Sequence, residues 1–216
     1  MKKILVVVDM QNDFIDGPLG TPEAIAIVDN VCAKIREGEW DWIIRTMDTH
    51  DDGYLDTQEG KKLPVGHCYE NTTGWCSNED VRCAIQEGCA AKADNDGYCR
   101  STIIPKDTFG STKLLYELLN SGVHDCNSEL TLIGVCTDIC VISNALLFKT
   151  YLPEMKIVVD AACCAGSSPE KHRMALEVMK SCQVEVENIP EDWIMISELT
   201  SDDFNKVMEA LGGKED

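Results

Sequence analysis

The stretch Leu130-Thr131-Leu132-Ile133-Gly134-Val135-Cys136-Thr137-Asp138-Ile139-Cys140-Val141 decides the fold. Residues 130–135 form a short apolar run, which is typical of a buried strand. Thr137 and Asp138 are helix-capping residue types, and residues 139–149 predict a largely apolar helix. Cys140 is then expected in the first helical turn, where free backbone N–H groups and the helix dipole stabilise a thiolate. On this stretch alone two interpretations stay open, a nucleophilic cysteine or two buried cysteines that pack as small hydrophobic side chains.

Outward from this stretch, strand-like and helix-like segments alternate along the chain. The predicted strands are 4–8, 42–47, 101–105, 130–135, 156–159 and 184–187, and the predicted helices are 21–36, 79–91, 111–120, 139–149, 168–181 and 202–211. This alternation predicts an α/β fold with three α/β/α layers around a doubly wound, mostly parallel six-stranded sheet. We expect one domain over residues 1–216, with a long loop region at about 48–100 that serves a metal or substrate.

The composition disfavours a nucleic-acid or membrane-binding protein and does not identify a substrate. The 216 residues carry a formal net charge of -19, whereas nucleic acids and anionic membranes attract basic surfaces. The apolar start of the chain ends at Asp9 without a cleavage site, and no stretch is long enough to cross a membrane. We therefore expect a cytoplasmic protein. The 12 cysteines include no Cys-x-x-Cys motif, which indicates reduced thiols.

Polar residues follow the predicted strands where those strands end. Asp9 follows the first strand, Asp48 and His50 the second, Lys106 the third and Cys140 the fourth. In open parallel sheets the ligand site lies beyond the carboxyl ends of the strands, at the point where strand order reverses. Each of these residues has a plain alternative role as a cap or an exposed charge. Their recurrence at matching strand ends predicts one shared site.

Four segments of the chain resemble motifs of one enzyme family. They are Asp9-Met10-Gln11-Asn12-Asp13-Phe14, Pro105-Lys106-Asp107-Thr108-Phe109-Gly110-Ser111, Gly134-Val135-Cys136-Thr137-Asp138-Ile139-Cys140-Val141 and Val158-Val159-Asp160-Ala161-Ala162. The family is that of the isochorismatase-like cysteine hydrolases. The resemblance runs over nearly the whole chain, and the combination of segments is more specific than any one of them.

The resemblance implies an amide hydrolase in which Cys140 is the nucleophile. Asp9 would be the general base and acid, and Lys106 would keep Asp9 ionised and favour the thiolate. Backbone N–H groups of Cys136 and Cys140 would form the oxyanion hole. The resemblance also implies a cis peptide bond between Val135 and Cys136. Asp138 is expected to face away from Cys140, because an inward carboxylate would raise the pKa of the thiol.

Within that family, Asp48-Thr49-His50 and Leu63-Pro64-Val65-Gly66-His67-Cys68 resemble the metal-binding segments of nicotinamidases. This implies a divalent metal on Asp48, His50 and His67, with zinc expected and iron or manganese as alternatives. It further implies cleavage of nicotinamide to nicotinate, a reaction of NAD salvage, with Phe14 packed on the substrate ring. Leu63 stands where these enzymes often have an aromatic residue.

Two other functions remain as alternatives at this point. One is a metal-free hydrolase of the same family that acts on another small amide, a ureide or a carbamoyl compound. The other is a non-catalytic binding or redox protein that uses its many thiols. The leading hypothesis is a small-molecule amidase without a nucleic-acid or membrane partner. A homo-oligomer is compatible with the resemblance.

Overall fold

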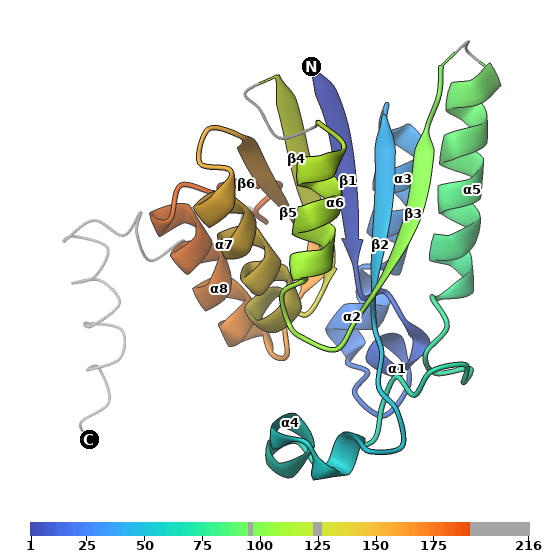
Figure 1. Ribbon diagram of the computed structural model, residues 1–216, viewed down its shortest axis with the longest axis vertical. Helices are drawn as coiled ribbons and strands as arrows, with labels where there is room; N and C mark the ends of the chain where they lie inside the picture. The colour runs from blue at the N-terminus through green and yellow to red at the C-terminus, as the bar shows by residue number, and fades with distance from the viewer. Residues whose placement is uncertain (95–96, 123–126, 191–216) are drawn as a thin grey trace, which may run out of the picture.

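The computed structural model describes residues 1–94, 97–122 and 127–190, which form a six-stranded sheet with helices on both faces (Figure 1). The strands are β1 (Lys2–Val8), β2 (Trp42–Asp48), β3 (Arg100–Lys106), β4 (Ser128–Val135), β5 (Lys156–Ala165) and β6 (Glu185–Glu187). Their order across the sheet is β3-β2-β1-β4-β5-β6, and every neighbouring pair is parallel. The predicted doubly wound fold is confirmed, with an entirely parallel sheet in place of a mostly parallel one.

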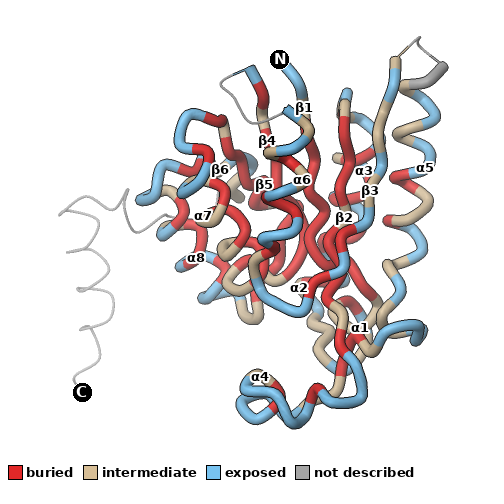
Figure 2. The backbone as a smooth tube through the Cα atoms, in the orientation of Figure 1, coloured by how far each residue is buried: buried red, intermediate tan, exposed pale blue. Residues whose placement is uncertain are grey.

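Two hydrophobic clusters, one on each face of the sheet, form the core. The helices α6 (Thr112–Asn120), α7 (Ile142–Tyr151) and α8 (Pro169–Ser181) pack on one face, and α2 (Pro22–Ala26), α3 (Val28–Glu37) and α5 (Glu79–Asp94) on the other. Alternate residues of β1 point to opposite clusters, so Val6 joins the first and Val7 the second. Figure 2 shows the buried central strands and the exposed outer sides of the helices. No helix in the described parts of the chain combines the length and apolar character needed to cross a membrane.

Two predicted element boundaries were wrong. The segment 21–36 is divided at Ile27 into α2 and α3, although Thr21 caps α2 and Pro22 follows it as predicted. β5 does not end at Asp160 but continues to Ala165, with a register shift opposite Leu132 and Gly134. The buried Asp160 is tolerated inside the strand because its carboxylate lies 2.7 Å from Lys34 Nζ and accepts a hydrogen bond from Asn188.

The long segment after β2 is ordered and partly helical. It contains the short 3₁₀ turn η1 (Tyr54–Asp56) and α4 (Gln58–Lys62), and the Thr57 side chain caps α4 by accepting a hydrogen bond from Gly60 N. Together with α1 (Asn12–Ile15), these elements lie at the carboxyl edge of the sheet (Figure 1). The predicted helix 202–211 lies outside the described residues.

The reversal of strand order falls between β1 and β4, where the two backbones come very close. Gly134 pairs with Val8 and has a φ of +114°, and a Cβ there would lie 2.1 Å from the Val8 carbonyl oxygen. Only glycine fits this position. The close approach places Asp9, which follows Val8, beside the turn that carries Cys136 and Cys140.

Candidate active site

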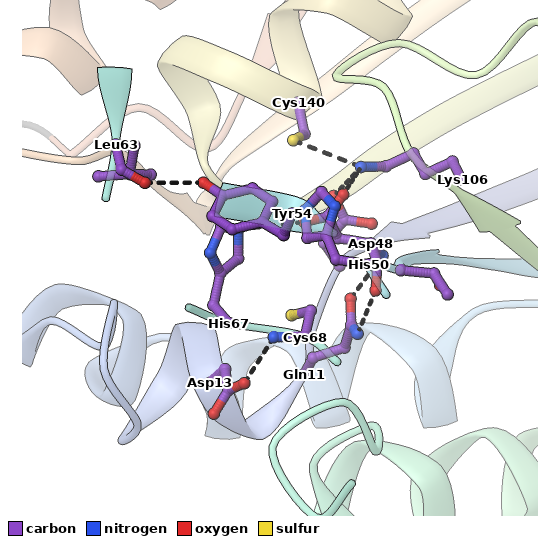
Figure 3. A network of polar contacts seen from close by, with 12 residues as sticks. Gln11, Asp13, Asp48, His50, Tyr54, Leu63, His67, Cys68, Lys106 and Cys140 are labelled. Carbon is purple, nitrogen blue, oxygen red and sulfur yellow. Dashed lines mark hydrogen bonds and ion pairs between the residues drawn. The ribbon is translucent and has the colours of Figure 1, made fainter. Parts of the chain in front are cut away.

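Lys106 contacts three acidic or thiol groups, of which Figure 3 labels Asp48 and Cys140. Its Nζ is 2.7 Å from Asp9 Oδ2, 3.2 Å from Asp48 Oδ1 and 3.6 Å from Cys140 Sγ. The Lys106 and Asp48 Cα atoms are partners in the β2–β3 register, which directs both side chains to the same place. The structure thus brings together Asp9, Lys106 and Cys140, which the sequence placed at three separate strand ends.

Asp9 is completely buried at the end of β1 in a left-handed conformation with a φ of +48°. Its Oδ1 accepts a hydrogen bond of 2.7 Å from the Thr46 hydroxyl of β2, and its backbone N–H donates to the same hydroxyl oxygen. The second carboxylate oxygen contacts Lys106, and, in addition to burial, the negative charge of Asp9 helps to raise the pKa of the Cys140 thiol. Asp9 therefore contacts the same ammonium group that lies 3.6 Å from the Cys140 thiol.

Cys140 lies in a π-helical turn, η2 (Thr137–Val141), and not in the first turn of a regular α-helix as predicted. The turn is closed by hydrogen bonds of Ile139 N and Val141 N to the Cys136 carbonyl, and α7 begins at Ile142. The turn is wider than an α-helical turn because the Val141 N–H donates to the carbonyl five residues earlier, whereas an α-helical N–H donates to the carbonyl four residues earlier. The Val135–Cys136 peptide bond is cis, as the resemblance implied.

Side chains outside the turn hold it from two sides. Asn144 Nδ2 donates a 2.8 Å hydrogen bond to the Cys140 carbonyl. The Asp138 carboxylate accepts hydrogen bonds of 2.7 Å from the backbone and the hydroxyl of Ser167. Asp138 therefore points away from the thiol, and the prediction for this residue is confirmed.

Burial governs the protonation of the site and corrects one expectation. Burial, followed by the Asp9 charge, raises the pKa of Cys140 well above its ordinary value, and the opposing effect of Lys106 does not reverse this. For Lys106, burial lowers the pKa, but Asp9, Cys140 and Asp48 together raise it further, so the ammonium group stays charged. The resting Cys140 is therefore a thiol, not the preformed thiolate expected from a helix terminus.

Asp48, His50 and His67 form a cluster of metal-ligand type beside the Lys106 group. One donor atom of each residue lies within 4.8 Å of the other two. Asp48 Oδ2 is 3.0 Å from His50 Nε2 and 3.4 Å from His67 Nε2, while its other oxygen contacts Lys106. The Nδ1 atom of His67 lies 2.8 Å from the Val65 carbonyl, which orients Nε2 toward Asp48. Two imidazoles and a carboxylate in this arrangement suit a divalent metal.

Aromatic rings enclose the two histidines. The Tyr54 ring centroid lies 4.4 Å from that of His50 and 4.9 Å from that of His67. The ring centroid of Phe14, which is half-buried, lies 5.5 Å from that of His67. Tyr54 is itself held by its hydroxyl, which donates to the Leu63 carbonyl. Phe14 is therefore close enough to the cluster to line a substrate site.

Sequence reasoning missed several residues that support the site. Gln11 Oε1 accepts from Asp48 N, and its Nε2 donates to the carbonyls of Asp48 and Trp75. Asp13 Oδ2 accepts a 2.6 Å hydrogen bond from Cys68 N, next to His67. Gln11 and Asp13 lie in the motif after Asp9, so that motif was the available signal. Thr46 and Asn144 carry no comparable signal, because their roles depend on tertiary contacts.

Comparisons with known proteins agree with this fold. The Isochorismatase domain model matches residues 3–191. A Bacillus subtilis isochorismatase family protein, PncA, is 28% identical over 181 residues, which cover 82% of this chain and 93% of that protein. The structure of a pyrazinamidase/nicotinamidase from Streptococcus mutans has a TM-score of 0.68 at 25% identity and covers 86% of this chain and 99% of its own. That of a Pyrococcus horikoshii pyrazinamidase in complex with zinc has a TM-score of 0.63 at 25% identity, with 88% and 100% covered.

The parallel sheet and its site define an α/β enzyme in which acid, ammonium and thiol groups meet where strand order reverses. The class is that of hydrolases with a buried polar centre at the carboxyl edge of the sheet. The chain belongs to the isochorismatase family, because the family model matches most of its length.

Proposed function

We propose that this hydrolase cleaves a small amide to an acid and ammonia with Cys140 as the nucleophile, and that nicotinamide is its substrate. The observation that carries the proposal is the contact of one ammonium group, Lys106 Nζ, with Asp9, Asp48 and Cys140. It joins a nucleophile and its base to the cluster of Asp48, His50 and His67. The names of the similar structures from Streptococcus mutans and Pyrococcus horikoshii support the amide class.

Asp9 starts the proposed reaction by taking the proton of the Cys140 thiol as the sulfur attacks the amide carbonyl. This transfer is needed because the buried thiol is protonated at rest. The carbon–sulfur bond forms, and the negative charge moves to the carbonyl oxygen. The positive charge of Lys106 offsets the negative charge that develops on the sulfur and the carbonyl oxygen during the attack.

Backbone N–H groups of Cys136 and Cys140 are the proposed oxyanion hole. The carbon–nitrogen bond then breaks, and Asp9 returns its proton to the leaving nitrogen, which departs as ammonia. Asp9 next removes a proton from water, whose oxygen attacks the thioester carbonyl. The carbon–sulfur bond then breaks, which releases the acid and leaves Cys140 as a thiolate. Cys140 recovers its proton from Asp9, so the cycle leaves the protein unchanged.

Asp48, His50 and His67 would hold a divalent metal, for which we propose zinc. The donor set fits, since it combines two imidazoles with a carboxylate and leaves further coordination positions open. When bound, the metal supplies a Lewis acid for a ring nitrogen of the substrate. The residues around it then orient the ring, with Phe14 and Tyr54 as neighbours of the histidine rings, and direct the amide toward Cys140.

Ammonia release from a panel of small amides, nicotinamide first, tests this function together with metal analysis of the purified protein. The proposal requires turnover of nicotinamide and one equivalent of metal per chain. Turnover of a ureide or carbamoyl compound by a metal-free protein would instead support the metal-free alternative. A protein with several reactive thiols and no turnover would point to the thiol-based alternative, against which the hydrolase family already argues.

A further inference from the structure

An apolar groove lies beside the catalytic centre, between α4 and the loop that follows β3. It has a volume of about 520 Å³, within the range of roughly 300–1,000 Å³ usual for ligand pockets. Leu63, Phe109 and Ile139 form its apolar walls, and Glu59, Lys62 and Asp107 add charged groups. Leu63 and Phe109 are 37% and 48% exposed, so large apolar surface is open to solvent here.

One side chain links the backbone of Phe109, which lines this groove, to the backbone of Cys140. Asn144 Nδ2 lies 2.8 Å from the Cys140 carbonyl oxygen and 3.3 Å from the Phe109 carbonyl oxygen. Phe109 and Cys140 are therefore both within hydrogen-bond distance of a single amide nitrogen. Ile139, another residue that lines the groove, directly precedes Cys140 in the η2 turn. The groove wall on this side is thus the outer surface of the nucleophile turn.

A second side chain connects the groove to the Asp48, His50 and His67 cluster. The Tyr54 hydroxyl donates a 2.9 Å hydrogen bond to the Leu63 carbonyl, while its ring packs on His50 and His67 (Figure 3). Gly60 allows α4 to sit this close, because a Cβ there would lie 2.1 Å from the Tyr54 carbonyl oxygen. The groove therefore borders both the η2 turn that carries Cys140 and the segment that packs on the Asp48, His50 and His67 cluster.

We propose that this groove is a second part of the substrate site, which holds an uncharged apolar arm attached to the ring of the amide. The inference rests on the proposed function and extends it from nicotinamide itself to ring carboxamides that carry such an arm. The three apolar walls favour an alkyl or aryl group, which gains free energy by leaving water. Two carboxylates against one ammonium group, in a chain of net charge -19, disfavour an anionic arm.

The test compares kcat/KM for nicotinamide with kcat/KM for its propyl derivatives at each free ring carbon. We expect at least one derivative to exceed nicotinamide by about tenfold or more, since a single methylene group in an apolar pocket can already contribute roughly tenfold. The same arm ending in a carboxylate should lose this advantage. A ratio of about one or less for every propyl derivative would overturn the proposal.

Two variants locate the effect in the groove. Phe109→Ser should bring the ratio of kcat/KM for the propyl derivative to kcat/KM for nicotinamide close to one. The control Tyr116→Ser changes an exposed aromatic residue on α6, outside the groove lining, and should keep the wild-type ratio. A ratio that persists in Phe109→Ser would reject the groove as its origin. Light scattering on both variants checks for a second copy, and a dimer that only Phe109→Ser dissociates would assign the groove to self-association.

Failure of the proposed function is distinguishable from failure of this inference. If the wild-type protein hydrolyses none of these amides, calorimetric Kd values of the same compounds on the same protein decide. Binding of a propyl derivative at least tenfold tighter than nicotinamide, abolished by Phe109→Ser, would support the groove. Equal affinities, or no measurable binding of any derivative, would reject it.

Discussion

Lys106 Nζ lies 2.7 Å from Asp9 Oδ2, and both side chains are almost completely buried. A buried ion pair is stable only while both partners are present, because either charge alone loses its hydration without compensation. Here the same ammonium group also contacts Asp48, which faces His50 and His67 with its other oxygen. Lys106 therefore couples the proposed nucleophile and base to the cluster of metal-ligand type.

Replacement of Asp9 should abolish most activity. Asp9→Asn removes the group that takes the Cys140 proton, and we expect kcat to fall on the order of a hundredfold or more. It should also lower the free energy of unfolding by about 3 kcal/mol, because Lys106 loses its shortest ion pair. Steady-state kinetics and denaturant unfolding measure the two effects. Asp51→Asn, at an exposed carboxylate near the site, should change neither.

The two cysteines at the η2 turn, Cys136 and Cys140, should differ in their effect on turnover. Cys140→Ala should abolish ammonia release, because it removes the atom that forms the thioester. Cys136→Ala should retain measurable activity, since only the backbone of that residue has a proposed role. Burial raises the pKa of the Cys136 thiol to about 12, and it is Cys140 whose sulfur lies 3.6 Å from Lys106 Nζ. Active Cys140→Ala protein would show that the wrong thiol was assigned.

The sequence predicted the sheet well because its strands are short apolar runs bounded by polar residues. The same boundaries predicted that Asp9, Lys106 and Cys140 would meet, since carboxyl ends of parallel strands share one edge. The polar-boundary criterion was wrong at Asp160, where Lys34 and Asn188 satisfy a carboxylate inside a strand. No local pattern reveals such long-range partners.

Other features of the site depend on contacts that only the folded chain creates. The π-helical turn around Cys140 and the roles of Thr46 and Asn144 arise from packing between elements distant in sequence. The protonated state of the thiol reverses the helix-terminus expectation for the same reason. Burial depends on the whole fold, and here it outweighs the local effect of the helix end.

Loss of a proposed metal ligand should impair substrate binding more than it impairs the cysteine. His67→Ala should lower the metal content of the purified protein and raise KM strongly, because the metal is proposed to orient the ring. Alkylation of Cys140 by iodoacetamide should continue in this variant. Cys76→Ser, at an exposed cysteine on the same segment, serves as the control and should keep wild-type metal content and KM. Unchanged metal content in His67→Ala would contradict the assigned ligand set.

His172 should make the stability of the protein depend on pH. The buried His172 ring, whose Nδ1 lies 2.7 Å from the Thr137 hydroxyl, packs behind the nucleophile turn. Burial lowers the pKa of His172 to about 4 in the folded protein, against an ordinary value of about 6.5 in the unfolded chain. Between these values the unfolded chain binds more protons, so the free energy of unfolding rises with pH. The stabilisation is complete above about pH 6.5 and is lost as the pH falls toward 4.

The expected loss over this interval is on the order of 2–3 kcal/mol. Other groups also titrate in this range, so the measurement compares wild-type protein with His172→Gln, which keeps a polar group without the titration. Denaturant unfolding at several pH values gives the free energy of unfolding of each protein. The value for the wild type minus the value for His172→Gln should decrease as the pH falls from 6.5 to 4. Parallel pH profiles would show that His172 titrates equally in both states. An increase of the wild-type value relative to the His172→Gln value on acidification would mean that the pKa of His172 is raised in the folded protein.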